Sequence, residues 1–332
     1  MMFRTIIFIL CIILTTVFSS ELLAQQPSGE KMEKEKPAEA LLIEKGGILL
    51  PKGMLQIEPS LQYSYLDRHM ISISGFYILE AILIGELAVS DMKRDILQGA
   101  LTARYGITSR LQAELKVPYI FRWDREIRGP GTTDISERTV SDNGIGDIEG
   151  ALFYHLLLGK RWIPDVILNV RAKSTTGRDP YHLKTDSEGR FLELPTGNGH
   201  WGFSGGFTAL KVSDPAVFFG SLNYYWNVKR NIGRGIGSVD PGDSYEGAFG
   251  VAYALSEKVS LSLQYQHRWT THTKQQGEKI PGSYLSAGTI FFGGNYALSK
   301  KTSVSLSVGV GVTNDAPDVQ VTLSMPFNFS IF

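Results

Sequence analysis

The chain has 332 residues, one cysteine and equal numbers of basic and acidic side chains, 33 of each. This charge balance gives no general attraction for nucleic acid or acidic surfaces, and a single cysteine excludes a disulfide framework. Beyond residue 24 no run of about 18 apolar residues occurs, which excludes a membrane-spanning helix there.

Residues 1–24 have the pattern of a cleaved secretory signal. Arg4 gives the start a positive charge, residues 5–18 are an unbroken apolar run, and cleavage is expected after Ala24. A membrane anchor is the rival interpretation, but this run is short for a bilayer span. Because Cys11 lies within the signal, the mature chain would have no thiolate catalyst and no cysteine zinc site.

Residues 25–53 are charged and almost free of aromatic side chains. This composition predicts a mobile periplasmic lead-in, and it leaves open whether the segment binds a periplasmic partner. From residue 54 to residue 332 the pattern becomes that of one β-domain.

Apolar and polar side chains alternate through this domain, most clearly in residues 111–123. Leu115 and Val117 fall on one face of a strand there, and Glu114 and Lys116 fall on the other, because successive side chains of a strand point to opposite faces. A barrel with a lipid-facing exterior and a wet interior produces this pattern. We predict twelve strands, near residues 54–67, 94–106, 110–123, 143–158, 164–176, 199–213, 215–229, 243–255, 258–271, 284–298, 302–313 and 318–331.

The connections between these strands are alternately short and long. Outer-membrane barrels have short periplasmic turns and longer outside loops. The predicted fold is therefore all-β, a transmembrane antiparallel β-barrel of about twelve strands in the bacterial outer membrane, with both chain ends in the periplasm. Three short turns have similar sequences: YGITSR at 105–110, YALSEK at 253–258 and YALSKK at 296–301.

Two segments fit this scheme less well. Segment 68–93 is predicted to extend the first two strands into an extracellular hairpin, and the alternative is a plug that folds into the barrel. In the last strand the apolar row from Val319 to Ile331 is out of step with the terminal Phe332. Either the terminal residue bends out or the strand register shifts near Pro326.

The polar rows would share one lumen, because a charge that faces hydrocarbon costs about 2–4 kcal/mol at mid-membrane. As a pore lining they would attract and orient a charged or polar solute; alternatively they form ion pairs that stiffen a narrow or closed barrel. Glu58 is a further candidate anion. The predicted pore-lining residues are Arg104, Glu114, Lys116, Arg122, Asp147, Glu149, Arg171, Lys173, Lys229, Glu246 and Arg268.

Other motifs favour structural roles. Gly144 and Gly146 precede a strand and not a helix, which favours a tight strand start over a nucleotide loop. The histidines at 155, 200, 267 and 272 lack the spacing of a metal site. Aromatic side chains form two groups, which predicts girdles at the two membrane interfaces, with an aromatic substrate path as the alternative. Tyr63, Tyr65, Tyr119, Phe121, Trp123, Tyr224 and Trp226 lie toward the long loops, and Phe153, Tyr154, Tyr253 and Tyr296 toward the short turns.

Four segments carry a resemblance to a known family: GMLQIEPSLQYSY at 53–65, RYGITSRLQAELKVPY at 104–119, NGIGDIEGALFYHL at 143–156 and TGNGHWGFSGGFTAL at 196–210. The chain resembles the MetA-pathway of phenol degradation family, a group of outer-membrane transporter barrels, over most of 46–332. The resemblance implies a barrel with a transport role and fixes no substrate. Where the family has Pro-Thr-Gly, this chain has Ser-Thr-Thr-Gly at 174–177.

We therefore predict an outer-membrane channel or transporter that passes a small solute through a narrow charged lumen, with no enzymatic activity and no cofactor. Its expected partners are outer-membrane lipid and a small-molecule solute, and not nucleic acid; the sequence leaves oligomerisation open. A structural or partner-binding barrel with a plugged lumen, an outer-membrane hydrolase and a soluble β-sandwich remain alternatives. The hydrolase would need a serine and a histidine within hydrogen-bond reach on the outer wall, and no such pair stands out in the sequence.

Overall fold

The computed structural model describes residues 49–73, 87–128, 136–160, 162–187, 191–233, 235–299 and 301–331. The predicted signal, nearly all of the predicted lead-in and the terminal Phe332 lie outside these residues. Among the described residues, no helix combines the length and the apolar character that crossing a membrane requires.

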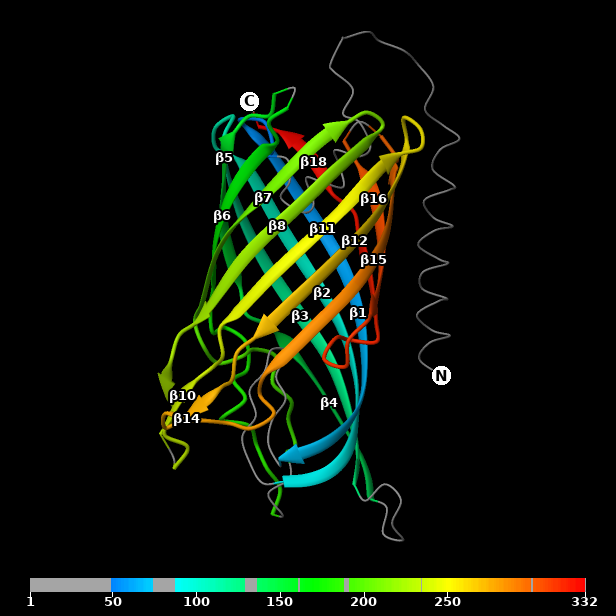
Figure 1. The fold of residues 1–332 in the computed structure, drawn as a ribbon. Helices are drawn as coiled ribbons and strands as arrows, with labels where there is room; N and C mark the ends of the chain where they lie inside the picture. The colour runs from blue at the N-terminus through cyan, green and yellow to red at the C-terminus, as the bar shows by residue number, and fades with distance from the viewer. Residues whose placement is uncertain are drawn as a thin grey trace. The chain divides into compact units, whose positions relative to one another are not determined.

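One antiparallel sheet closes on itself, because β1 pairs with β2 on one side and with β17 and β18 on the other. The predicted twelve-stranded barrel is confirmed, since β4 and β5 both pair with the same side of β3, and β17 and β18 both pair with the same side of β1. Figure 1 shows the closed wall. The wall strands are β1 (Met54–Ile73), β2 (Leu87–Gly106), β3 (Leu111–Arg128), β4 (Ser136–Ile145), β5 (Glu149–Leu157), β6 (Asp165–Lys173), β7 (Gly202–Ser213), β8 (Ala216–Asn227), β11 (Ser244–Ala254), β12 (Val259–Thr270), β15 (Leu285–Ala297), β16 (Ser303–Gly311), β17 (Val319–Ser324) and β18 (Phe327–Ser330).

The first hairpin is longer than the membrane needs. β1 and β2 pair without a break from Leu55 and Tyr105 to Ile73 and Leu87. The predicted extension of the first two strands is confirmed on both sides of the hairpin tip, and the tip itself, residues 74–86, lies outside the described residues.

The predicted strand 143–158 is wrong in one respect, because it is two strands. β4 pairs with the half of β3 nearer the long connections, where Tyr119 lies opposite Ile145. β5 pairs with the half of β3 nearer the short turns, where Lys116 lies opposite Glu149. The two registers differ by one residue, which is the effect of a β-bulge. Even-numbered residues therefore point inward in β4, and odd-numbered residues point inward in β5.

The last strand keeps a single register. Ser60 pairs with Ser324 in β17 and Ile57 pairs with Phe327 in β18, an offset that continues unchanged across Pro326. The predicted alternative of a register shift near Pro326 is wrong. Proline interrupts the ladder there because it has no N–H to donate.

The three similar short turns share one hydrogen-bond pattern. In each, the third residue of the motif donates its N–H to a carbonyl four residues on: Ile107 to Leu111, Leu255 to Val259 and Leu298 to Thr302. The hydroxyl of the fourth residue accepts the N–H of the sixth, as Thr108 does from Arg110. The sequence similarity of these turns thus reports a common local structure.

The two faces of the wall differ as the alternation predicts. Along β3, Leu115 and Tyr119 are exposed, whereas Gln112 and Arg122 on the opposite row are 0% and 2% exposed. The exposed apolar row covers the outside of the closed sheet and the polar row its inner face. Exposed aromatic side chains on this outer face include Phe121, Tyr154, Tyr224, Trp226, Tyr253 and Tyr296.

The short-turn end of the interior is apolar, which the sequence did not predict. Phe153, placed by prediction in an outer girdle, lies instead on the inner face of β5 in a buried cluster with Ala151, Ile167 and Leu210. This prediction was wrong because a row of mixed composition, such as 149, 151 and 153, does not identify its own face. Leu49, the first described residue, packs against this cluster.

The long connections fold against one another at the other end of the barrel. A four-stranded sheet forms there from β9 (Arg230–Asn231), β10 (Ser238–Asp240), β13 (Lys274–Gln275) and β14 (Glu278–Lys279). Ile232 and Val239 from this region form a buried cluster with Tyr181, which comes from the connection between β6 and β7. Figure 1 shows β10 and β14 at the end opposite the short turns.

Candidate functional site

The connection between β6 and β7, residues 174–201, folds against the inner face of the wall, and we call it the inner loop. Its described residues are 174–187 and 191–201. Residues 194–200 are seven consecutive buried positions. A loop usually runs over the surface because its backbone polar groups need water or other partners. The wall must therefore supply those partners.

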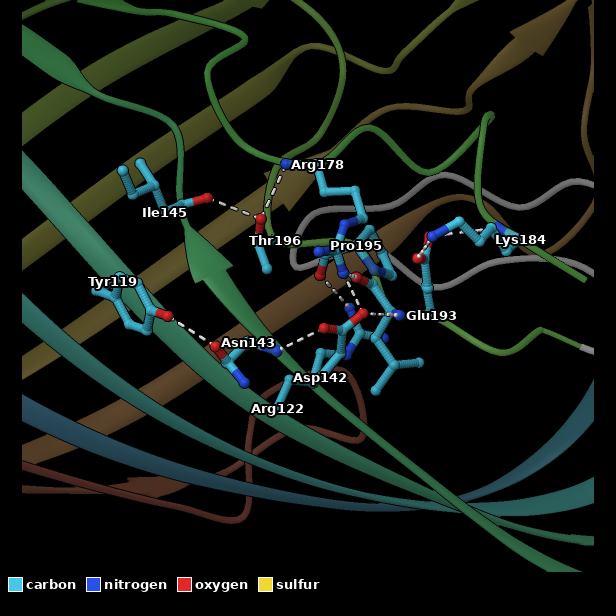
Figure 2. Close-up of polar contacts among 11 residues, drawn as sticks. Tyr119, Arg122, Asp142, Asn143, Ile145, Arg178, Lys184, Glu193, Pro195 and Thr196 are labelled. Carbon is cyan, nitrogen blue, oxygen red and sulfur yellow. Dashed lines mark hydrogen bonds and ion pairs between the residues drawn. The ribbon is translucent and has the colours of Figure 1, made fainter.

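Side chains of β3 and β4 bind the backbone of the inner loop (Figure 2). The Leu194 N–H donates to Oδ2 of Asp142 at 2.9 Å, and Arg178 donates to the same carboxylate. Nη1 of Arg122 donates to the Pro195 carbonyl at 3.3 Å. The Thr196 hydroxyl donates to the Ile145 carbonyl at 2.8 Å.

Asp147 makes the second set of contacts with the inner loop. Its two carboxylate oxygens accept the N–H groups of Gly177 and Asn198, each at 3.0 Å. The two arms of the loop cross closely at this point, where a Cβ added to Gly177 would lie only 2.7 Å from the backbone of Gly197. Glycine at both positions allows this crossing.

A buried tyrosine–histidine pair joins the inner loop to the start of the next long connection. The Tyr181 hydroxyl lies 2.7 Å from Nε2 of His200, and Nδ1 of His200 lies 2.8 Å from the Val228 carbonyl. Since that carbonyl can only accept, Nδ1 carries the proton and the hydroxyl donates to Nε2. Arg230 donates to the Gly199 carbonyl and to Asp179.

Burial shifts the titration of this pair. Burial lowers the pKa of His200, with a further contribution from the charge of Arg230. Burial also raises the pKa of the Tyr181 hydroxyl. For Asp179, burial opposes ionisation, but hydrogen bonds from His182 and from the Tyr181 N–H and the charge of Arg230 leave the pKa below its ordinary value. Both members of the pair are therefore neutral near pH 7.

An ion-pair network crosses the inner face from β1 to β6. Arg104 donates to Glu58 at 2.7 Å and to Glu114 at 2.8 Å. Arg171 reaches over β5 to Glu114 at 2.9 Å and also binds Glu149 at 2.7 Å. Four of the predicted pore-lining residues, Arg104, Glu114, Glu149 and Arg171, are thus one connected group.

A second ionic cluster lies nearer the inner loop. Asp124 accepts bidentate contacts from Arg94 and from Arg122, with shortest distances of 2.9 and 2.6 Å. Arg122 was predicted to line the pore, whereas Arg94 and Asp124 were not. Through the contact of Arg122 with Pro195, this cluster connects the wall to the inner loop.

The remaining predicted residues are distributed around the barrel. Glu246 binds Arg268 at 2.7 Å, and the Arg268 guanidinium lies 4.5 Å from the centre of the Tyr225 ring. Lys116 and Lys173 are half-buried, and Lys229 is exposed beyond the end of β8. Asp147 is buried and bound to the inner loop, as described above. The structure thus gathers part of the predicted set into pairs and leaves Lys229 apart.

The opposite side of the interior carries few charges. The buried polar side chains of β12, β15, β16 and β17 are hydroxyls and amides: Ser260, Gln264, Thr270, Thr289, Asn295, Ser303, Ser305 and Ser324. The interior therefore has one ionic side, whose charges are largely paired, and one neutral hydrogen-bonding side.

The histidines have separate partners. His155 binds Asp165 at 2.9 Å on the inner face near the short turns, and His267 lies on the outer face within 2.9 Å of Ser286. The described residues contain no group of three or more His, Cys, Asp or Glu side chains arranged for a metal ion. Ser286 and His267 are a serine and a histidine within hydrogen-bond reach on the outer wall, as the hydrolase alternative requires, and no sequence motif indicated this pair.

Sequence reasoning missed Asp142, Arg178 and Asp124. Asp142 and Arg178 are 36 residues apart, and their contact depends on the inward fold of a loop whose composition resembles that of any outside loop. The bulge before β5 also hid Asp142, because it and Asp147 both point inward at an odd spacing. Asp124 lies one residue beyond the predicted strand 110–123. A search for opposite charges across adjacent strands, extended by one residue, could have found it opposite Arg94.

Comparison with known proteins gives one family match and several similar solved structures, of which the COG4313 channel supports this architecture. Residues 88–329 match the model of the family described as "Putative MetA-pathway of phenol degradation". The COG4313 outer membrane channel from Pseudomonas putida F1 has a similar structure, with a TM-score of 0.60 and 15% identity over 85% of this chain and 97% of that chain. The P. putida toluene transporter TodX gives a TM-score of 0.43 and 10% identity over 89% and 92% of the two chains.

The fold and its outer surface together give the location of the protein. A closed barrel leaves no unpaired sheet edge, so it can cross a bilayer, and an apolar outer face requires lipid around it. The chain is therefore a barrel of the bacterial outer membrane.

Proposed function

Because the chain belongs to the MetA-pathway of phenol degradation family and has the fold of an outer-membrane channel, we propose that it passes a small polar solute through the barrel. The solute moves past the inner loop and then along the ionic side of the lumen. We assign the protein no enzymatic activity and no cofactor.

One observation carries the proposal: residues 194–200 of the inner loop are buried against inner-face side chains of β3, of β4 and of the bulge between β4 and β5. This loop narrows the outer mouth. It is attached by a small number of polar contacts and not by a strand pairing, so its release changes the width of the path without opening the wall.

The charge arrangement supports a polar solute. Acidic and basic groups alternate along the ionic side, with Arg104 between Glu58 and Glu114 and Arg171 between Glu114 and Glu149. Such pairs offer groups of both signs that orient a polar solute, and they produce little net field that would attract ions of one sign. The pore-lining roles of Lys116, Lys173, Lys229, Glu246 and Arg268 belong to the same proposal.

Conductance in planar bilayers tests this function. We expect small unitary currents from the wild-type protein and a larger open fraction from Asp142→Asn and from Asp147→Asn. Asparagine keeps one acceptor oxygen and replaces the other with an NH₂ donor, and it removes the negative charge. Asp147→Asn therefore leaves the N–H of Gly177 or of Asn198 without its acceptor, a loss of about 1–3 kcal/mol, and Asp142→Asn weakens the shared contact with Arg178 and the Leu194 N–H. Asp165→Asn is the matched control, because Asp165 lies at the short-turn end and binds His155 and the Gly159 N–H.

The alternative of a structural barrel with a plugged lumen rests on the same ion pairs, since they also stiffen the wall. It predicts no current and no solute flux into liposomes from the wild-type protein or from either loop variant. That result would end the transport proposal. Equal currents from Asp147→Asn and Asp165→Asn would instead exclude the inner loop as the narrowing element.

A further inference from the structure

A groove of about 400 Å³ crosses the lipid-facing side of the wall between β7, β8, β11 and β12. Its sides are apolar and aromatic, with Phe207, Leu222 and Phe249 among them, and the glycines at 220 and 247 leave its base without side chains. The groove is continuous with the exposed apolar face, so hydrocarbon is the medium that fills it.

Three polar side chains meet at one end of this groove. The Tyr265 hydroxyl lies 2.7 Å from Nδ1 of His267, and Oγ of Ser286 lies 2.9 Å from Nε2. Trp269 stacks on the imidazole with the ring centres 4.2 Å apart. Tyr265, His267 and Trp269 occupy the outward row of β12, and they alternate with the inward Gln264, Gln266 and Arg268.

Glycines keep this polar group accessible from the membrane. His267 pairs with Gly247 of β11 on one side and with Gly288 of β15 on the other. Neither neighbour has a side chain to cover the imidazole. Ionisable side chains exposed to lipid are rare, and such a residue is a candidate functional site.

The Tyr265–His267–Ser286 group has one more donor hydrogen than its two internal hydrogen bonds use. A neutral imidazole has one N–H, and the two hydroxyls have one O–H each. The two hydrogen bonds within the group use two of these three hydrogens. Among the described residues neither hydroxyl has a second partner, so either Tyr265 or Ser286 presents a free O–H toward the membrane.

The depth of the group indicates which acceptor is available. Trp269 lies near the end of β12, at the level of the aromatic girdle and the lipid headgroups. His267 is two residues deeper, or about 5 Å along the membrane normal for a strand rise of about 3.3 Å and a tilt of about 40°. At this depth the acyl chains of the outer leaflet begin, and their ester carbonyls are the oxygen acceptors nearest to the hydrocarbon.

From these observations we propose that the groove is a binding site for one acyl-ester lipid of the outer leaflet. Its acyl chain lies along the glycine base between Leu222 and Phe249, and its carbonyl oxygen accepts the free hydroxyl hydrogen of the Tyr265–His267–Ser286 group. This site is independent of the proposed transport, because it lies on the opposite face of the wall from the lumen.

Binding explains the group better than acyl transfer does. A serine nucleophile needs N–H donors nearby for the developing oxyanion, and the Ser286 N–H is already donated to Oδ2 of Asp315 at 2.7 Å. The short contact between Ser286 and His267 therefore places a hydrogen-bond donor at the lipid carbonyl, and it does not complete a hydrolase site.

The test compares two lipids by native mass spectrometry of the full-length protein. The barrel is exchanged from detergent into mixed micelles with 1-palmitoyl-2-oleoyl-phosphatidylethanolamine, or with its diether analogue, which lacks both carbonyls. We expect one retained ester lipid per barrel and about tenfold less retention of the diether lipid, the effect of losing one hydrogen bond in a dry site.

Three variants test whether the preference for the ester lipid over the diether lipid arises at the groove. His267→Phe keeps the stack on Trp269 and should remove the preference for the ester lipid. Gly247→Leu should reduce retention of both lipids, because the new side chain fills the groove. Gly294→Leu is the matched control: its added Cβ lies 3.7 Å from Leu261 on the same outer face and outside the groove, and it should leave both values unchanged.

Equal retention of the two lipids by the wild-type protein, or an undiminished preference in His267→Phe, would overturn the proposal. Covalent labelling of Ser286 by a fluorophosphonate would also overturn it, since the pair would then be reactive toward acyl groups. Folding of every variant is checked by its heat-dependent mobility in gels. None of these results depends on whether the barrel conducts.

Discussion

Asp147 demonstrates how much of the inner loop depends on one carboxylate. Its two oxygens accept N–H groups from residues on both arms of the loop, Gly177 and Asn198. The sequence predicted that Asp147 points inward to line the pore, and in the structure Asp147 is buried against the inner loop. Its partners could not be predicted, because they lie 30 and 51 residues away in a segment with no regular secondary structure.

His200 gives the inner loop a pH dependence that can be measured. Burial lowers its pKa in the closed loop, whereas an opened loop would return it to about 6.5. The open state thus binds more protons below pH 6.5, so the closed loop has its full stability above about pH 6.5 and loses stability as the pH falls.

Hydrogen exchange of residues 191–201 measures this effect. After correction for the intrinsic pH dependence of exchange, we expect less protection at pH 5 than at pH 7.5 in the wild-type protein. His200→Gln, which cannot titrate, should show equal protection at the two values. A wild-type loop with unchanged protection at pH 5 would contradict the assignment of a neutral, buried His200.

At the scale of the element, alternation predicted the strands well and their faces less well. The period of two is a local property that a single strand displays in its sequence, and so eleven of the twelve predicted positions correspond to one strand or one continuous register. The bulge between β4 and β5 depends on pairing with β3. No local pattern contains that information.

Adjacent residues of β12 test the assignment of the two faces. Leu263 is exposed on the outer face, and Ser262 points inward. Leu263→Lys should lower the free energy of unfolding in lipid vesicles by about 2–4 kcal/mol, the cost of a lysine near the bilayer midplane. Ser262→Lys adds the same charge to the aqueous side, and its effect should be much smaller.

Urea titrations of the protein in vesicles give both values. A loss for Ser262→Lys that equals or exceeds the loss for Leu263→Lys would mean that the faces are reversed. The comparison is sharp because the two positions are consecutive in the same strand and lie at nearly the same depth, and they differ in the face to which the side chain points.

For the whole molecule, the sequence predicted that the sheet closes into a barrel, but it did not predict that the β6–β7 connection lies against the inner face. Alternating short and long connections require an even number of strands, and the pairing of β1 with β17 and β18 confirms the closed barrel. The sequence predicted that 68–93 forms a hairpin, with a plug as the alternative, and it suggested no other segment for the interior. The described structure places the β6–β7 connection against the inner face, because Arg122, Asp142 and Asp147 bind its backbone.

The inner loop and the wall approach each other closely enough for a reversible cross-link. A Cβ added at Gly144 would lie 3.5 Å from Cγ2 and 3.6 Å from Oγ1 of Thr196, so a cysteine sulfur in either of these positions at residue 196 is within reach of a sulfur on residue 144. The only cysteine of the chain, Cys11, lies in the predicted signal and should not compete. Gly144→Cys with Thr196→Cys therefore locks the loop when oxidised and releases it when reduced.

Conductance of this double variant in planar bilayers tests the central claim most directly. We predict that the oxidised protein carries almost no current and that a reductant raises the current to the wild-type value or above it, because Thr196→Cys also removes the hydroxyl contact with Ile145. The reductant should have no effect on the wild-type protein. Equal currents before and after reduction, with the disulfide confirmed by mass spectrometry, would contradict a solute path that passes the inner loop.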